Sequence, residues 1–95
     1  MTSSTQRELE DAAAVAFLGT VNATLTARAG TYPAYSDEAQ RVANIWAALY
    51  PEAAMTPQQV PAFMMVVKLV RDAGGNSPDS LIDLCGYAAR KAGMQ

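Results

Sequence analysis

The sequence has no histidine, a single cysteine and only two lysines among its 95 residues. Without histidine the chain cannot form Ser-His or Cys-His catalytic pairs, and it lacks the usual general base and the commonest metal ligand. One cysteine, Cys85, can form neither an internal disulfide nor a zinc cluster. An apolar run such as Phe63 to Val67 is far too short to cross a bilayer. These absences exclude several classes of enzyme and predict no association with membranes.

Acidic residues outnumber basic ones, nine to seven, which leaves a net charge of −2. Such a chain binds polyanions poorly, so polymeric DNA or RNA is not expected as the main partner. A length of 95 residues with 51% apolar content supports one folded domain over residues 1–95, with a single modest core. The first residues, Met1 to Asp11, lack the layout of a signal peptide, and we expect a cytoplasmic protein.

Apolar residues recur at helical spacing in four segments, and the first two are bounded by clear signals. The first helix is predicted to open at Thr5, with Glu8 completing a capping box, and to extend to about Arg28. The second is predicted to begin after Ser36, a favourable N-cap, and to end at Pro51.

The other two helices enclose a glycine-rich turn at 74–77. The third is predicted to start with Thr56 as N-cap and Gln59 as the partner in a capping box. The fourth is predicted to start at Pro78, with Ser77 as N-cap, and to end just before Gly93. The sequence therefore predicts an all-α fold, a small bundle of three to four helices.

The third helix is apolar on nearly every side, which is typical of a helix buried from several directions. We expect it to be central in the bundle or to form part of an interface in a homo-oligomer. One face carries Val60, Phe63, Met64, Val67 and Val70, and another carries Ala62, Met65, Val66 and Leu69.

Charged side chains cluster on both sides of the predicted turn. Residues equidistant from the turn of an antiparallel hairpin face each other, so Arg71 should meet Asp79 and Lys68 should meet Asp83. Tyr87 shares the face of the two aspartates. The cluster is either two ion pairs that set the hairpin register, or a polar site that holds a phosphate, a carboxylate or a metal ion.

The loop after the first helix carries a second candidate cluster. Arg28, Tyr32 and Tyr35 flank this loop and form either a packing cluster or an aromatic platform with a cation, suited to a nucleobase and its phosphate. Trp46 lies on the apolar face of the second helix and is expected in the core. Cys85 is expected to be a small buried apolar residue.

The order of charged, glycine and aromatic residues resembles a family of small, mostly phage-encoded helical proteins of unknown function. Its members typically contain R-x-x-x-Y-G, R-I-A-x-L-W, T-x-x-x-V, K-x-x-R and D-S-x-x-D-x-x-G-Y-A, in that order. The resemblance implies a helical fold and a phage or prophage origin, but no defined activity. The matching positions in this chain are Arg28 and Tyr32, Arg41 to Trp46, Thr56 and Val60, Lys68 and Arg71, and Asp79 to Ala88.

The spaced aspartates and the preceding cations are also similar, more weakly, to the MazG-like all-α nucleotide pyrophosphohydrolases. That resemblance implies a helical bundle whose carboxylates hold Mg²⁺ while a nucleoside triphosphate is cleaved. Asp79 and Asp83 would supply two ligands, and Glu8, Glu10 or Asp11 would supply the others.

These observations together favour a non-enzymatic phage accessory protein that binds a small phosphorylated ligand, such as a nucleotide, or a host protein in the host cytoplasm. No residue is assigned to catalysis and no cofactor is expected. The alternative is the metal-dependent pyrophosphohydrolase, with Mg²⁺ at the two aspartates. The candidate ligand-binding residues are Arg28, Tyr32, Lys68, Arg71, Asp79, Asp83 and Tyr87.

Overall fold

The fold is all-α, as predicted. The computed structural model describes residues 4–29, 34–75 and 79–94, and within these ranges it contains helices and no strand. None of these helices has the length and apolarity that a bilayer span requires. The elements are α1 (Ser4–Arg28), α2 (Tyr35–Leu49), the short 3-10 helix η1 (Pro51–Ala53), α3 (Gln59–Ala73) and α4 (Ser80–Gly93).

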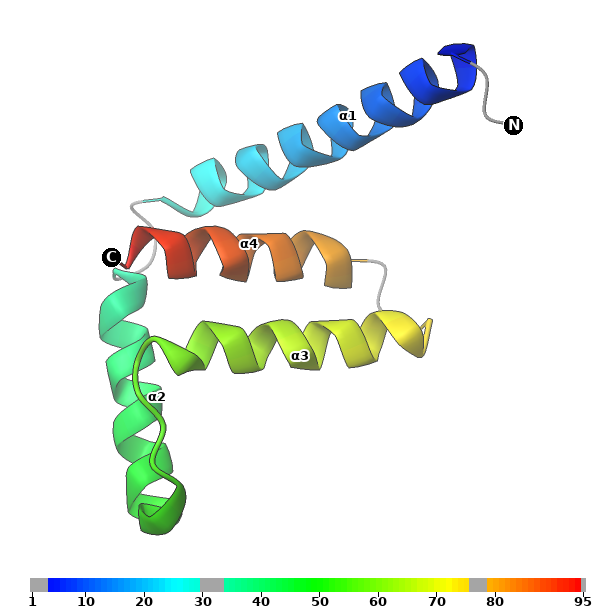
Figure 1. Ribbon diagram of the computed structural model, residues 1–95. Helices are drawn as coiled ribbons and strands as arrows, with labels where there is room; N and C mark the ends of the chain where they lie inside the picture. Colours follow the sequence, from blue (N-terminus) through cyan, green and yellow to red (C-terminus); the bar gives the residue numbers. More distant parts are fainter. Residues whose placement is uncertain (1–3, 30–33, 76–78, 95) are drawn as a thin grey trace.

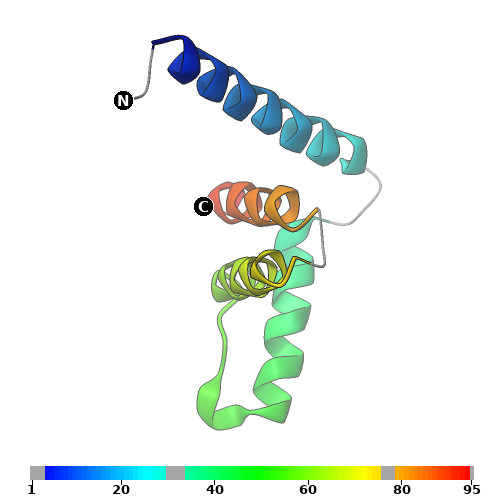
Figure 2. The same ribbon diagram turned by 90° about the vertical axis from the view of Figure 1, so that its right-hand side faces the viewer.

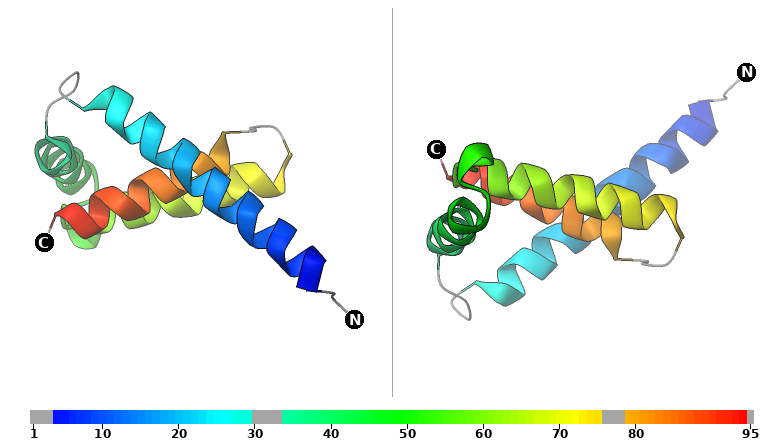
Figure 3. Two further views of the ribbon diagram at one scale, coloured as in Figure 1. Left: turned by 90° about the horizontal axis from the view of Figure 1, so that it is seen from above. Right: turned by 90° about the horizontal axis from the view of Figure 1, so that it is seen from below.

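The helices pack in the order α1, α4, α3, α2 rather than in chain order. Figure 1 shows α3 and α4 as an antiparallel hairpin, with α1 on the other side of α4 and α2 nearly perpendicular to α3. The N-terminal half of α1 diverges from α4 and extends beyond the body, as the views in Figures 2 and 3 also show. The molecule is therefore elongated, with extents of 54 × 30 × 25 Å.

The hydrogen bonds of the predicted capping box form before α3, although the helix begins at Gln59 with Gln58 at the N-cap position, and not with Thr56 as N-cap as predicted. The backbone N–H of Thr56 donates to Oε1 of Gln59 at 2.8 Å, and the N–H of Gln59 donates back to Oγ1 of Thr56 at 3.3 Å. Pro61 follows in the first turn and is fully buried. Because the first N–H groups of a helix have no helical acceptor, the missing N–H of this proline costs no hydrogen bond.

The prediction that Ser36 is the N-cap of α2 is wrong. The helix begins at Tyr35, and Ala34 occupies the N-cap position with an extended ψ of 136° and no side-chain cap. The carbonyl of Ala34 accepts hydrogen bonds from the N–H groups of Asp37 and Glu38, so Ser36 already lies inside the first turn. The two acidic residues stand at the positive end of the helix dipole, as predicted.

The other helix ends differ from prediction by one or two residues. α1 includes Ser4, one residue before the predicted start at Thr5. α4 is helical from Ser80, and Gly93 is its last residue rather than the residue after its end. The predicted N-cap of α4, Ser77, and its predicted first residue, Pro78, lie outside the described residues.

The core is small and lies where α2 meets the start of α3. Trp46, which we expected in the core, is only half-buried. Its indole Nε1 donates to the carbonyl of Ala53 at 2.7 Å, which holds η1 against α2. The buried apolar centre consists of Ala39, Ala43 and Val60, with Tyr35, Met55 and Met94 packed against it.

Candidate functional site

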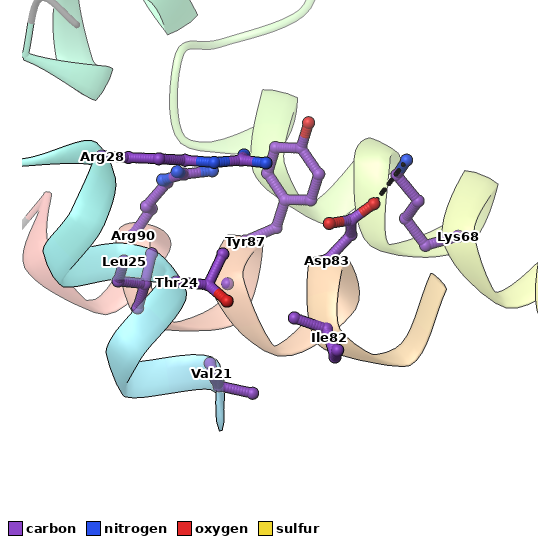
Figure 4. Close-up of a pocket in the computed structure, with 10 residues that line it drawn as sticks. Val21, Thr24, Leu25, Arg28, Lys68, Ile82, Asp83, Tyr87 and Arg90 are labelled. Atoms are coloured by element: carbon purple, nitrogen blue, oxygen red, sulfur yellow. Dashed lines mark ion pairs between the residues drawn. The ribbon is translucent and has the colours of Figure 1, made fainter. Parts of the chain in front are cut away.

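A pocket lies where α1 crosses the α3–α4 hairpin. Its cavity volume is about 270 Å³. Side chains from three helices enclose it, and Figure 4 shows how they converge. The residues that line it are Val21, Thr24, Leu25 and Arg28 of α1, Lys68 of α3, and Ile82, Asp83, Gly86, Tyr87 and Arg90 of α4.

The predicted ion pair between Lys68 and Asp83 is confirmed and forms one wall of this pocket. The distance from Nζ to Oδ2 is 3.0 Å, and the two side chains are only 12% and 26% exposed. Partial burial strengthens the attraction relative to a fully exposed pair, because water screens it less. The pair therefore links α3 to α4 and places the ammonium group in the lining of the pocket.

The second predicted pair, between Arg71 and Asp79, is not formed in the part of the chain that the structure describes. Both residues are exposed, and neither lines the pocket. The rule of equidistant residues assumed that the fourth helix starts at Pro78. Asp79 instead precedes the first helical residue, with a φ of −91° and a ψ of 2°, so its side chain does not follow the helical register.

The other candidates divide between the pocket and the loop before α2. Arg28 and Tyr87 line the pocket, as a ligand site would require. Tyr32 lies outside the described residues. The prediction missed Arg90, which follows Asp83 and Tyr87 by seven and three residues on the same face of α4. That spacing, i, i+4 and i+7, is the signal that could have identified it.

The guanidinium group of Arg90 contacts two aromatic rings. Its guanidinium carbon lies 5.5 Å from the ring centre of Tyr35 and 5.7 Å from that of Tyr87. The rings are themselves 6.0 Å apart with an interplanar angle of 59°. These cation–π contacts favour the orientation in which the guanidinium group lines the pocket.

The surroundings of Tyr35 change the acidity of its hydroxyl group. Burial is the main cause that raises its pKa to about 12, and the nearby Tyr87 and Glu38 add to the effect, while Arg90 lowers it. The hydroxyl of Tyr35 therefore remains protonated throughout the physiological range and can donate a hydrogen bond.

The pocket is positively charged although the whole chain is negative. Arg28, Lys68 and Arg90 contribute three cationic groups, and Asp83 contributes the one carboxylate of the lining. In the described part of the chain, Arg28 makes no ion pair or hydrogen bond with its side chain. Figure 4 shows the side chains of Arg28 and Arg90 both directed into the pocket. Guanidinium groups that line one cavity can donate hydrogen bonds to an anion.

The carboxylates do not gather into a metal site in the described residues. No group of three or more acidic, cysteine or histidine side chains lies close enough together to hold a metal ion there. Glu8, Glu10 and Asp11 belong to the half of α1 that diverges from α4, far along the chain from the pocket-lining residues of that helix (Figure 1). They do not join Asp79 and Asp83 in a common cluster.

A second, apolar pocket of about 250 Å³ shares Tyr87 with the first. It lies between α2 and the hairpin, and Glu38 is the one charged residue in its lining. The rings of Trp46 and Phe63, whose centres are 5.8 Å apart, form part of it. The remaining lining residues are Tyr35, Val42, Met55, Val60 and Met64.

A comparison with protein families identifies the family of this chain. The model of a domain of unknown function, DUF6378, matches residues 16–95. The chain belongs to this family. The DUF6378 match includes every residue of the cationic pocket and leaves out most of the diverging half of α1. No curated protein and no solved structure matches the chain.

Proposed function

We propose that this DUF6378 protein is a non-enzymatic binder of a small phosphorylated ligand, held in the cationic pocket. The observation that carries the proposal is the convergence of Arg28, Lys68 and Arg90 beside Tyr87 in one cavity of about 270 Å³. The proposal includes the role that the sequence resemblance implies, that of a phage accessory protein in the host cytoplasm.

Each cation has a distinct part in this proposal. The guanidinium groups of Arg28 and Arg90 provide planar, forked donors that match two oxygens of a phosphate group. Lys68 adds a third charge, and Asp83 orients it at 3.0 Å. The ring of Tyr87 provides an apolar surface for the organic part of the ligand.

The size of the cavity limits the ligand. A volume of about 270 Å³ lies just below the range for small-molecule pockets, which is about 300 to 1,000 Å³. A phosphate group with a compact organic substituent, such as a nucleoside monophosphate, suits this space better than a large cofactor. The net positive lining selects an anion over a neutral compound of the same shape.

The direct test compares two exposed arginines. Arg28→Gln removes a pocket cation that has no protein partner in the described structure, so it should leave the fold intact. Arg71→Gln is the matched control, since Arg71 is exposed and lies outside the pocket. We expect inorganic phosphate and nucleoside monophosphates to raise the melting temperature of the wild type and of Arg71→Gln. Their affinity for Arg28→Gln should fall by about tenfold or more.

Three results would contradict this function. One is a wild-type melting temperature that no phosphorylated compound raises, which would favour a host protein as partner. Another is an equal loss of affinity in Arg28→Gln and Arg71→Gln, which would show that binding does not use the pocket. The third is release of pyrophosphate from a nucleoside triphosphate with Mg²⁺, which would favour the hydrolase.

Gly86 allows a second test in which stability and binding change in opposite directions. It is buried in α4 and lines the pocket, and a Cβ built on it would lie 3.8 Å from Cδ2 of Leu25, an ordinary contact. Gly86→Ala should therefore raise the free energy of unfolding, by up to about 1 kcal/mol from helix propensity. The added methyl group should weaken phosphate-ester binding, because it occupies space at the pocket wall. Chemical denaturation and calorimetric titration measure the two effects.

A further inference from the structure

The apolar pocket between α2 and the hairpin is rich in aromatic rings. Its cavity volume is about 250 Å³. Four of the seven aromatic residues of the chain line it, and the other lining residues are two methionines, two valines and one glutamate. The four aromatic residues are Tyr35, Trp46, Phe63 and Tyr87.

The rings form two tilted pairs rather than parallel stacks. The ring centres of Trp46 and Phe63 are 5.8 Å apart with an interplanar angle of 58°. Those of Tyr35 and Tyr87 are 6.0 Å apart with an angle of 59°. Because tilted rings do not cover each other's faces completely, part of the electron-rich surface of each pair remains open to a ligand.

The indole of Trp46 is positioned by contacts outside the pocket lining. Its Nε1 donates to the carbonyl of Ala53 at 2.7 Å. The ring of Tyr50, which does not line the pocket, lies against the indole with a centre-to-centre distance of 5.0 Å. These two contacts favour one placement of the indole in the absence of a ligand, which reduces the cost of binding.

Glu38 is the one charged residue of the lining. It follows Tyr35 by three residues and precedes Val42 by four and Trp46 by eight, so all of them lie on one face of α2. Its negative charge is one of the causes that raise the pKa of Tyr35, so this charge acts at the pocket wall. Within the described residues its carboxylate makes no ion pair.

The faces of aromatic rings attract cations, and the chain already uses two rings of this pocket in that way. Arg90 contacts Tyr35 and Tyr87, but it lines the cationic pocket and not the apolar one. In the described part of the chain, no cation lies over the ring of Trp46 or Phe63. The apolar pocket therefore combines a carboxylate and aromatic faces with no positive group of its own.

We propose that the apolar pocket binds a small organic cation with a methylated ammonium group, held against Trp46 and Phe63 and balanced in charge by Glu38. Methyl groups suit an apolar lining, and the positive charge suits the ring faces and the carboxylate. A cavity of about 250 Å³ favours a compact ligand. The two pockets thus select ligands of opposite charge.

The test uses choline as the probe and, as its partner, the neutral analogue in which a carbon atom replaces the nitrogen. Trp46 is the only tryptophan in the sequence, so its fluorescence reports directly on this pocket. We expect choline to change this fluorescence. Calorimetric titration should give an affinity about tenfold higher for choline than for the neutral analogue, which has the same shape.

Two variants and one matched control test the residues that carry the proposal. Glu38→Gln should weaken choline binding by about fivefold, whereas Asp37→Asn should not, since Asp37 is the neighbouring exposed carboxylate outside the lining. Phe63→Leu keeps an apolar side chain but removes the ring. It should weaken choline binding by about threefold and leave the neutral analogue unaffected. Phe63 is 46% exposed, so this variant should retain the helical circular dichroism spectrum.

The inference does not depend on the proposed binding of phosphate. Arg28→Gln should lose phosphate binding and keep choline binding, and Glu38→Gln should show the reverse, so either proposal can fail alone. No response to choline up to high millimolar concentrations would overturn the inference. Equal affinity for choline and its neutral analogue would do the same, because the pocket would then accept any apolar compound. Equal losses in Glu38→Gln and Asp37→Asn would also contradict it, since binding would depend only on net charge.

Discussion

Both faces of α3 carry valines, but the surroundings of these valines are opposite. Toward α4 and α2, Val60 is only 3% exposed, and Lys68 is paired with a carboxylate of α4. On the other side, Val66 and Val70 are 57% and 68% exposed. The same residue type on one helix is therefore either core or surface according to which neighbours the chain supplies. A helix that is apolar all round needs more neighbours than this chain has.

The two faces of α3 also differ in charge. The face that packs on α4 contributes Lys68 to the lining of the cationic pocket, whereas Val66, Leu69 and Val70 on the opposite face are all apolar.

The largest expected effect comes from matched truncations on the two faces. Val60→Ala should lower the free energy of unfolding by about 2 kcal/mol, because it leaves a cavity beside Ala39 and Ala43 in the core. Val66→Ala should cost under about 0.5 kcal/mol in dilute solution, since the side chain is mostly exposed. Urea denaturation in dilute solution measures both. Equal costs in dilute solution would remove the distinction between the faces.

The second largest effect is expected from the ion pair on the charged side of α3. Asp83→Asn should lower the free energy of unfolding by about 2 kcal/mol, because it leaves Lys68, which is 12% exposed, without its carboxylate. Asp79→Asn is the control and should cost under about 1 kcal/mol, since that residue is exposed and unpaired within the described structure. An unfolding midpoint of Asp83→Asn equal to that of the wild type would show that the ion pair contributes nothing to stability.

A smaller, opposite effect is expected at the start of α4. Ser80 is fully buried, and its Oγ makes no hydrogen bond in the described structure. Ser80→Ala removes this unsatisfied group and should raise the free energy of unfolding by about 1 kcal/mol more than Ser36→Ala, an exposed serine in the first turn of α2. The pair controls for helix propensity, which alanine improves at both sites. A lower melting temperature of Ser80→Ala than of Ser36→Ala, measured by thermal denaturation, would contradict this expectation.

The smallest effect is the pH dependence that Tyr35 introduces. Because its pKa is raised from 10.0 to about 12, the folded state favours the protonated hydroxyl. The associated stability is fully present below pH 10.0 and is lost as the pH rises through about 12. Spectrophotometric titration should show one tyrosine that ionises near pH 12 in the wild type and not in Tyr35→Phe. Ionisation of all the tyrosines of the wild type near pH 10 would mean that the cluster of Tyr35 with Tyr87 and Arg90 does not form in solution.

Local signals in the sequence predicted the local features. The helical spacing of apolar residues identified all the α-helices in the described ranges, and the capping box at Thr56 and Gln59 formed as predicted. The start of α2 was wrong because Ser36 is a good N-cap by type, while the backbone of Ala34 accepts the first helical bonds. Residue type indicates where a helix can start, and the backbone path that leads into it decides where it does.

Part of the candidate site was predicted, because the geometry of a helical hairpin determines which residues of its two helices face each other. Positions equidistant from the turn correctly paired Lys68 with Asp83 across α3 and α4. The rule failed for Arg71 and Asp79, since it holds only where both residues are already helical. The spacing of Asp83, Tyr87 and Arg90 places Arg90 on the same face of α4, but its contact with Tyr35, which lies 55 positions earlier in the chain, does not follow from that spacing.

The sequence by itself determined an all-α fold, its approximate helix limits, and the ion pair near the turn. These depend on residues within a few turns of one another, whose geometry is set by the helical repeat. Only the tertiary structure decided that α1 crosses α4, that Arg28 and Arg90 line one pocket, and which apolar side of α3 remains exposed. Those outcomes depend on contacts between distant segments. Such contacts arise from non-directional apolar burial, which sequence spacing does not encode.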